Sequence, residues 1–279
     1  MSLTPGNMVV LKTHHISLAL ENVPQSLLPH IQFIFRPFIT ANHQANIHGT
    51  ISIEKTNNQT LVIKEGGEVR FQGPESHGVM ALVNLLNIKF LLETRNYLTL
   101  HAASLRTSPS KAIVIAGASN NGKSTLTLYL VEKGLGFLGD EGIFVTPGTA
   151  LFLPYPRAVS YPWGEFPKRL NKFCRSRISE SVSYFRPREE CISTYRIPHR
   201  IEALVFVARG EATRFTPIDK KETLLELGKH VLGAPRGVLV ESLLDIAQQV
   251  TLSYKASWSR WEDLFLLGDE ILDKVAHLV

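Results

Sequence analysis

Cysteine is scarce in this chain, and long hydrophobic runs are absent. Only Cys174 and Cys191 occur, without a C-x-x-C spacing, which argues against a disulfide framework or a zinc site and favours a reducing compartment. The longest apolar stretch, residues 79–92, is interrupted by two asparagines and a lysine, so it is too short and too polar to cross a bilayer. No charged start followed by an apolar segment marks a secretory signal. We therefore expect a cytoplasmic protein with no membrane partner.

Repeats and low-complexity tracts are also missing, and the hydrophobic content of 44% over 279 residues can bury a real core. This length allows one large domain or two modest ones. Residues 1–75 are punctuated by Asn, Gly and Pro between short apolar runs, which predicts a β-rich N-terminal region that can also extend the sheet of the rest. Residues 76–279 form the predicted α/β core, with a helical C-terminal part.

Apolar periodicity and turn residues predict the individual elements of the core. The predicted strands are 98–103, 112–116, 136–139, 142–146 and 201–207, and the predicted helices are 77–94, 124–133, 219–232, 239–249 and 259–278.

Basic charge is concentrated in one segment. The chain carries a net charge of +5, and residues 157–200 hold ten Lys and Arg against four Asp and Glu. Arg157, Arg175, Arg177 and Arg186 are therefore candidate substrate-binding residues for an acidic partner, and a solvated surface is the alternative. We expect no nucleic-acid partner, because the segment has no recognition-helix or zinc-finger pattern.

The pattern with the most chemical content is a glycine-rich loop between a predicted strand and a predicted helix. The loop reads Gly117, Ala118, Ser119, Asn120, Asn121, Gly122, Lys123, Ser124 and Thr125. It fits G-x-x-x-x-G-K-[ST], the phosphate-binding loop of nucleotide-binding proteins. Glycines let backbone N–H groups approach phosphates, and the helix start adds a positive dipole end. Lys123 is expected to reach the β and γ oxygens, and the Ser124 hydroxyl to bind Mg²⁺.

A second chemical feature is the acidic pair Asp140 and Glu141. The helix 124–133 runs roughly 15 Å away from the loop, and the strand 136–139 returns a similar distance at ~3.3 Å per residue. If that strand runs parallel to 112–116, Asp140 emerges where the phosphates bind. There it can bind Mg²⁺ or accept a proton from an attacking hydroxyl, whereas the alternative is a simple turn residue.

His101 is the third candidate, because it ends one predicted strand just before the strand that leads into the loop. If the two strands are neighbours, its imidazole lies beside the phosphates. The alternative is a structural histidine in an apolar strand.

These residues, in this order, resemble a known family. The stretch 100–103 with His101, the 117–125 loop, Gly134 after the helix, and 138–141 with the acidic pair are similar to the HPr kinase/phosphorylase-like kinases. These enzymes have the phosphoenolpyruvate-carboxykinase-like ATP-binding fold. The resemblance implies an HPr-kinase-like core with a P-loop, Asp140 as general base, Lys123 and Ser124 as phosphate and Mg²⁺ ligands, and His101 near the phosphates.

The chain also departs from the family pattern in ways that bear on the acceptor. Asn120 and Asn121 stand where glycine is common, Thr125 replaces the usual Glu, and Glu141 replaces an Asp. The chain looks more like the shorter kinases of peptide-modification clusters, such as those that phosphorylate lasso-peptide precursors.

The sequence thus predicts an ATP- and Mg²⁺-dependent kinase that phosphorylates a Ser or Thr hydroxyl of a peptide or protein. The metal ligands are expected to be Ser124, Asp140 and Glu141. Two alternatives stay open: a small-molecule kinase on the same scaffold, and a non-catalytic nucleotide-binding regulatory protein. The resemblance also allows a homo-oligomer.

Overall fold

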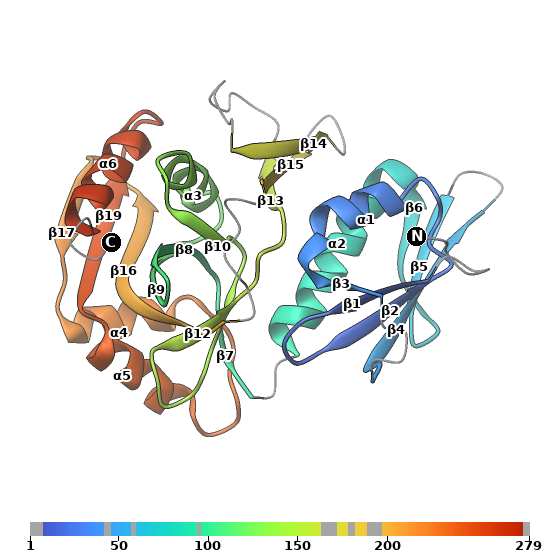
Figure 1. The fold of residues 1–279 in the computed structure, drawn as a ribbon, viewed down its shortest axis with the longest axis horizontal. Coiled ribbons are helices and arrows are strands. Elements are labelled where there is room, and N and C mark those ends of the chain that lie inside the picture. Colours follow the sequence, from blue (N-terminus) through green and yellow to red (C-terminus); the bar gives the residue numbers. More distant parts are fainter. Residues whose placement is uncertain are drawn as a thin grey trace. The chain divides into compact units, whose positions relative to one another are not determined.

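The computed structural model describes residues 8–41, 46–56, 60–93, 96–162, 172–177, 182–188 and 197–275. The fold is mixed α/β and separates into two compact units (Figure 1). The first comprises the described residues of Met1–Phe90, Ser160–Phe166 and Arg175–Arg186, and the second those of Leu91–Val159, Pro167–Cys174 and Pro187–Val279. No helix among the described residues is both long and apolar enough to cross a membrane.

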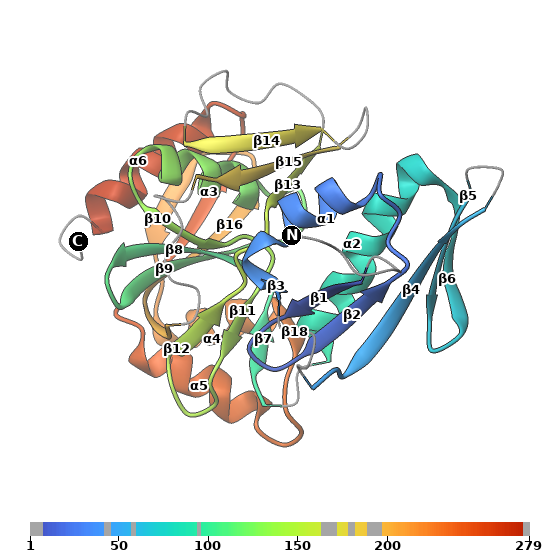
Figure 2. The same cartoon turned by 45° about the vertical axis from the view of Figure 1, so that its right-hand side comes forward.

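The first unit contains a six-stranded sheet in the order β3-β1-β2-β4-β5-β6. Its strands are β1 (Val9–Lys12), β2 (Ser17–Glu21), β3 (Ile39–Thr40), β4 (Gly49–Lys55), β5 (Thr60–Glu65) and β6 (Glu68–Pro74). The helices are α1 (Leu28–Ile34), the 3₁₀ turn η1 (Arg36–Phe38) and α2 (Glu75–Leu92). Both α-helices lie on the same face of the sheet (Figures 1 and 2).

Helix α2 packs with this first unit up to Phe90, whereas the sequence prediction puts the boundary before the helix, between residues 75 and 76. The contacts explain the difference. The Phe90 ring stacks on Phe38, with ring centroids 6.3 Å apart, and Gly78 lies so close to the Leu61 side chain that an added Cβ would meet it at 2.2 Å. The apolar helix therefore covers the β-rich region.

The second unit is built on a larger sheet. Its strand order is β10-β8-β9-β16-β12-β11-β7-β18, with β19 beside β16 and β17 beside β19. These strands are β7 (Leu98–Leu100), β8 (Ala102–Ser108), β9 (Lys111–Ala116), β10 (Gly136–Gly139), β11 (Ile143–Val145), β12 (Leu151–Pro154), β16 (His199–Arg209), β17 (Arg214–Pro217), β18 (Val231–Gly233) and β19 (Leu252–Trp258). A separate three-stranded sheet, most of whose residues belong to the first unit, has the order β13 (Val159–Pro162), β15 (Val182–Pro187), β14 (Phe173–Arg177).

Strand direction decides which loops meet in this unit. β9 pairs in parallel with β16, and β16 in parallel with β19. β8 lies antiparallel between β9 and β10, so β10 runs in the same direction as β9. The carboxyl ends of β9, β10, β16 and β19 therefore point to one end of the sheet.

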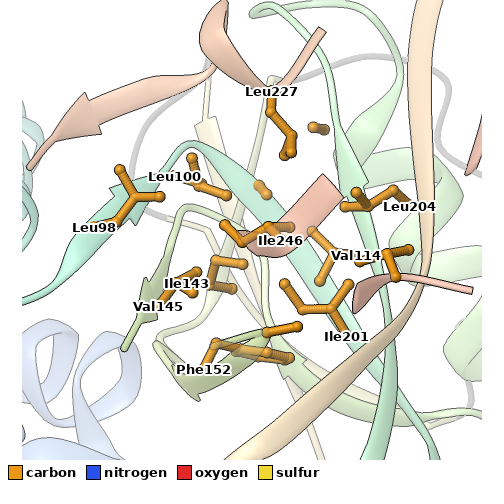
Figure 3. Packing of buried hydrophobic residues seen from close by; sticks show 14 of the residues in the cluster. Leu98, Leu100, Val114, Ile143, Val145, Phe152, Ile201, Leu204, Leu227 and Ile246 are labelled. Carbon is orange, nitrogen blue, oxygen red and sulfur yellow. The ribbon is translucent and has the colours of Figure 1, made fainter. Parts of the chain in front are cut away.

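Helices cover both faces of this sheet. α3 (Lys123–Glu132) and α6 (Asp263–Val275) lie on one face, and α4 (Lys220–Gly228) and α5 (Leu239–Gln249) on the other (Figures 1 and 2). The core under α4 and α5 joins Leu227 and Ile246 to Val114, Ile201 and Leu204 of the central strands (Figure 3). Packing against two faces explains why these strands are apolar along their whole length.

Some predicted elements differ from the observed ones. The prediction of a single strand over 98–103 is wrong, because the chain breaks at His101 into β7, which pairs with β11 and β18, and β8, which pairs with β9. The predicted helix 259–278 begins only at Asp263, whose carboxylate accepts hydrogen bonds from the backbone N–H groups of Ser259 and Arg260. The strands β17 and β19 were missed. β17 is short and has no apolar alternation, whereas β19 alternates Leu252, Tyr254, Ala256 and Trp258 with polar residues, a signal that the prediction overlooked.

Helix α4 should depend on its N-cap, Asp219, whose carboxylate accepts a hydrogen bond of 2.8 Å from the Glu222 N–H. We expect Asp219→Ala to lower the free energy of unfolding by ~1 kcal/mol, because one N–H of the first turn loses its acceptor. Urea denaturation followed by circular dichroism measures this change. Asp219→Ser is the matched control, since serine caps equally well; an equal loss in both variants would show that the cap is not responsible.

Candidate active site

The 117–125 loop connects β9 to α3 at the carboxyl end of the sheet. Asn120 and Gly122 adopt left-handed backbone conformations, with φ of 63° and 88°. Asparagine tolerates this conformation better than most residues, which explains how Asn120 replaces the glycine common in such loops. At Gly117 an added Cβ would lie 2.4 Å from the Val207 carbonyl oxygen, so only glycine fits there.

Lys123 is buried inside the loop, with 6% of its surface exposed. Its ammonium donates hydrogen bonds to the carbonyl oxygens of Gly117, at 2.6 Å, and Ala118, at 3.1 Å. Burial lowers the pKa of Lys123, and the carboxylates of Asp140 and Glu141 oppose this shift. The lysine therefore stabilises the loop from within by binding two of its carbonyl oxygens.

Ser124 is the second residue of α3, and its hydroxyl donates a 2.7 Å hydrogen bond to Oδ2 of Asp140. Asp140 follows β10, and the register of β10 on β8 shifts between Phe137 and Gly139. Such a bulge turns the chain and can redirect the side chain that follows. The expected parallel direction of β10 and β9 is observed, although β8 separates the two strands.

Asp140 is a buried carboxyl group, 3% exposed. Burial, with a further contribution from the nearby Glu141, raises its pKa to about 7, while the Ser124 hydroxyl, Lys123 and Arg157 act in the opposite direction. Its second oxygen, Oδ1, is buried and has no hydrogen-bond partner in the described part of the chain. An unsatisfied buried acceptor is costly, so this oxygen is suited to a ligand.

Glu141 lies between a buried arginine and His101. Arg157, 1% exposed, donates a hydrogen bond from its guanidinium to Oε1 of Glu141 and another, at 2.7 Å, to the Ala158 carbonyl oxygen. The other Glu141 oxygen is 3.8 Å from Nε2 of His101. The expectation that Arg157 binds the substrate on an exposed surface does not fit this position, because the side chain is buried and neutralises an acid of the site.

His101 and His230 lie side by side at the edge of the site. The His101 N–H donates a 2.8 Å hydrogen bond to the His230 carbonyl oxygen. Burial and then the nearby positive charge of Lys123 lower the pKa of both imidazoles, that of His230 to about 4. Both rings are therefore neutral at pH 7. Sequence reasoning missed His230, since it stands in no motif.

The donor set suits a magnesium ion better than a structural metal. No group of three or more His, Cys, Asp or Glu suited to a metal occurs among the described residues. Mg²⁺ is commonly held by one or two carboxylates together with substrate phosphates and water. The unpartnered Asp140 Oδ1 and the Ser124 hydroxyl are hard oxygen donors of this kind. Glu141 is already paired with Arg157 and is less available.

Side chains of β19 and α6 contact the 117–125 loop and support it. Trp258 donates a 2.9 Å hydrogen bond from its indole N–H to the Asn121 carbonyl oxygen. A Cβ at Gly122 would lie 2.8 Å from the Leu264 side chain. The loop is therefore fixed by long-range contacts that no local motif reveals.

A pocket of about 580 Å³ opens beside the loop. Gly117, Ala118 and Asn121 line it on the loop side, and Phe206, His230 and Lys255 are among the residues opposite. This volume is in the range of small-molecule binding sites.

The other basic candidates give no support for a docking surface. The side chains of Arg175 and Arg177 lie outside the described part of the chain. Arg186 belongs to the first unit, where its guanidinium lies over the Phe33 ring at 5.0 Å from the centroid.

Comparison with known proteins adds one structural likeness. No protein-family model matches the chain. No curated protein matches it either. Among solved structures, the chain is similar to the HPr(Ser) kinase/phosphatase from Coxiella burnetii, with 13% identity and a TM-score of 0.32 over 64% of this chain and 97% of that chain. At this TM-score the likeness carries no argument, and the function rests on the geometry of the site.

The buried Asp140 should make stability depend on pH. Its folded pKa of about 7 exceeds the ordinary 3.8, so the native state gains stability from holding the proton at low pH and loses it as pH rises to 7. A pKa shift of this size changes the free energy of unfolding by at most ~4 kcal/mol. Without nucleotide or Mg²⁺, Asp140→Asn should therefore be more stable than wild type at pH 8, and the gap should narrow towards pH 5.

Thermal unfolding at several pH values measures this difference in stability between Asp140→Asn and wild type. Asp273→Asn, an exposed carboxylate of α6, is the control and should follow wild type throughout. A difference in stability between Asp140→Asn and wild type that does not change with pH would contradict the raised pKa of Asp140.

Proposed function

We propose that this chain is an ATP-dependent kinase that transfers the γ-phosphoryl group to a Ser or Thr hydroxyl of a peptide or protein. The observation that carries the proposal is the hydrogen bond between Ser124 and Asp140 beside the buried Lys123. This hydrogen bond joins the phosphate-binding motif to a carboxylate of raised pKa. Phosphoryl transfer needs both kinds of group.

The 117–125 loop and the start of α3 bind the phosphates. The first N–H groups of a helix have no acceptor within the helix, so they and the dipole favour an anion. The Lys123 ammonium exchanges its carbonyl partners, Gly117 and Ala118, for phosphate oxygens. Its positive charge then offsets the charge that develops on the transferred group.

Ser124 and Asp140 would hold the magnesium ion, which neutralises phosphate charge when bound. Asp140 is also the candidate base for the acceptor hydroxyl, because one of its carboxylate oxygens, the buried Oδ1, has no hydrogen-bond partner among the described residues. Arg157 fixes Glu141, and the neutral His101 is placed to donate or accept a hydrogen bond at the rim of the site.

A peptide acceptor is favoured over the alternatives by resemblance and charge only. The segment 157–200 carries an excess of Lys and Arg, which favours acidic groups of a peptide, although Arg157 itself is buried against Glu141. The peptide-modification context, including lasso-peptide precursors, stays an expectation. A small-molecule acceptor on the same scaffold is the second candidate. A regulatory nucleotide-binding protein is less favoured, because binding alone requires no buried carboxylate at the phosphates.

Lys123→Ala should weaken the binding of MgATP by about 10- to 100-fold, because a charged phosphate contact is lost. Isothermal titration calorimetry measures the change. Lys133→Ala is the matched control: it removes a lysine after α3 whose partner is Asp269, and it should leave binding unaltered. Unchanged affinity in Lys123→Ala would rule out the phosphate-binding role.

Asp140→Asn should keep MgATP binding within a few-fold yet lower phosphoryl transfer by about 10²-fold or more, because the amide cannot take the hydroxyl proton. Transfer from γ-labelled ATP to serine-containing peptides encoded beside the gene, followed by mass spectrometry, measures this. Peptides with the serine replaced by alanine are the acceptor control. Normal transfer by the variant would make Asp140 a turn residue only.

A further inference from the structure

The pocket beside the loop is floored by two rows of side chains on one face of the sheet. The register of β16, β19 and β17 puts Phe206, Lys255 and Thr216 opposite one another, and Ala208, Ser257 and Arg214 two residues further along. All six residues line the pocket. The rows are two residues apart and therefore point to the same face. This floor is an ordered feature of the sheet rather than a gap between loops.

One wall of the pocket is aromatic and uncharged. The rings of Phe206 and His230 are nearly parallel, with 17° between their planes and centroids 6.1 Å apart. His230 is neutral at pH 7, because burial and Lys123 lower its pKa to about 4. Neutral flat rings favour contact with another flat, weakly polar ring.

The two lysines at the rim are neutralised within the protein, whereas Arg214, which also lines the pocket, forms no ion pair with another described residue. Lys229 bonds to Oε1 of Glu226 at 2.8 Å, and Lys255 bonds to the same oxygen at 2.9 Å and also to Glu222. A strongly anionic occupant would gain little from ammonium groups that are already paired. The paired lysines therefore favour a neutral, hydrogen-bonding group beside them, and Arg214 can bind one polar or anionic group of the same ligand.

The proposed phosphate and magnesium ligands Ser124 and Asp140 lie apart from the pocket, whereas His101, 3.8 Å from Glu141, is one of its lining residues. The pocket is on the β16 and β19 side, whereas Asp140 follows β10, beyond β8. Neither Ser124 nor Asp140 lines the pocket. An acceptor hydroxyl has to reach Asp140, so the pocket is placed for the part of the donor that does not react.

We propose that this pocket binds the nucleoside of the phosphoryl donor, with a purine base beside Phe206 and His230 and the ribose hydroxyls towards Thr216 and Ser257. The assignment rests on the proposed function. With the nucleoside in this pocket, the acceptor hydroxyl approaches Asp140 from the β10 side of the loop.

The test compares MgATP with inorganic tripolyphosphate, which has the phosphates and no nucleoside. Thr216→Trp fills the pocket from an exposed position of β17. It should raise the Kd of MgATP by about tenfold or more, while the Kd of tripolyphosphate stays within about twofold. Thr251→Trp, the same change at an exposed position outside the pocket lining, should alter neither constant.

A second pair of variants tests the aromatic wall without filling the pocket. His230→Ala should weaken the binding of MgATP but not the binding of tripolyphosphate, and His230→Phe should restore the affinity for MgATP. The hydrogen bond from His101 goes to the backbone oxygen of His230, so both variants keep it.

Three outcomes would overturn the assignment. Unchanged MgATP affinity with a raised KM for the acceptor would give the pocket to the acceptor. If the pocket variants lost affinity for MgATP and for tripolyphosphate equally, the substitutions would act on phosphate binding or on folding. Failure of the wild-type protein to bind either compound would instead reject the proposed function itself, and the nucleoside pocket with it.

Discussion

The site depends on the mutual compensation of buried charges. Lys123, Asp140 and Arg157 are each at most 6% exposed, and isolated charges at such depth would be very costly. They are tolerated because Glu141 pairs with Arg157, and because Lys123 lies where the field of two carboxylates supports its charge. Removing Glu141 would leave Arg157 buried without this carboxylate, whereas the charge of Asp140 is only partly offset by its neighbours. The four residues therefore act as one unit rather than as separate contributors.

The β-sheet brings this unit together. Antiparallel β8 sets β10 in the same direction as β9, so the residues after both strands emerge at one end of the sheet. Gly139 is so close to the Tyr155 carbonyl oxygen, 2.7 Å from an added Cβ, that only glycine fits before Asp140. Backbone proximity therefore fixes the carboxylate, and a loop-borne acid would be held less firmly.

The same sheet separates two sides of the loop. Asp140 and Ser124 lie towards β8 and β10, and the floor of the pocket lies towards β16 and β19, while His101 contributes to both sides. Trp258 and Leu264 support the loop from β19 and α6. A rigid loop between two differently lined sides is suited to holding a phosphate chain whose two ends need different surroundings.

The sequence alone predicts the strand, loop and helix around Lys123, because glycine spacing and apolar runs are local signals. It also predicts that Asp140 returns to the loop end of the sheet, since a helix and a returning strand have fixed rises per residue. It predicts neither the break at His101 nor the burial of Arg157, and it leaves His230 and Trp258 without a role. Those depend on pairings such as β7 with β18 and on contacts across more than a hundred residues. Only the tertiary structure could decide them, because burial and pairing between distant segments have no periodic signature in the chain.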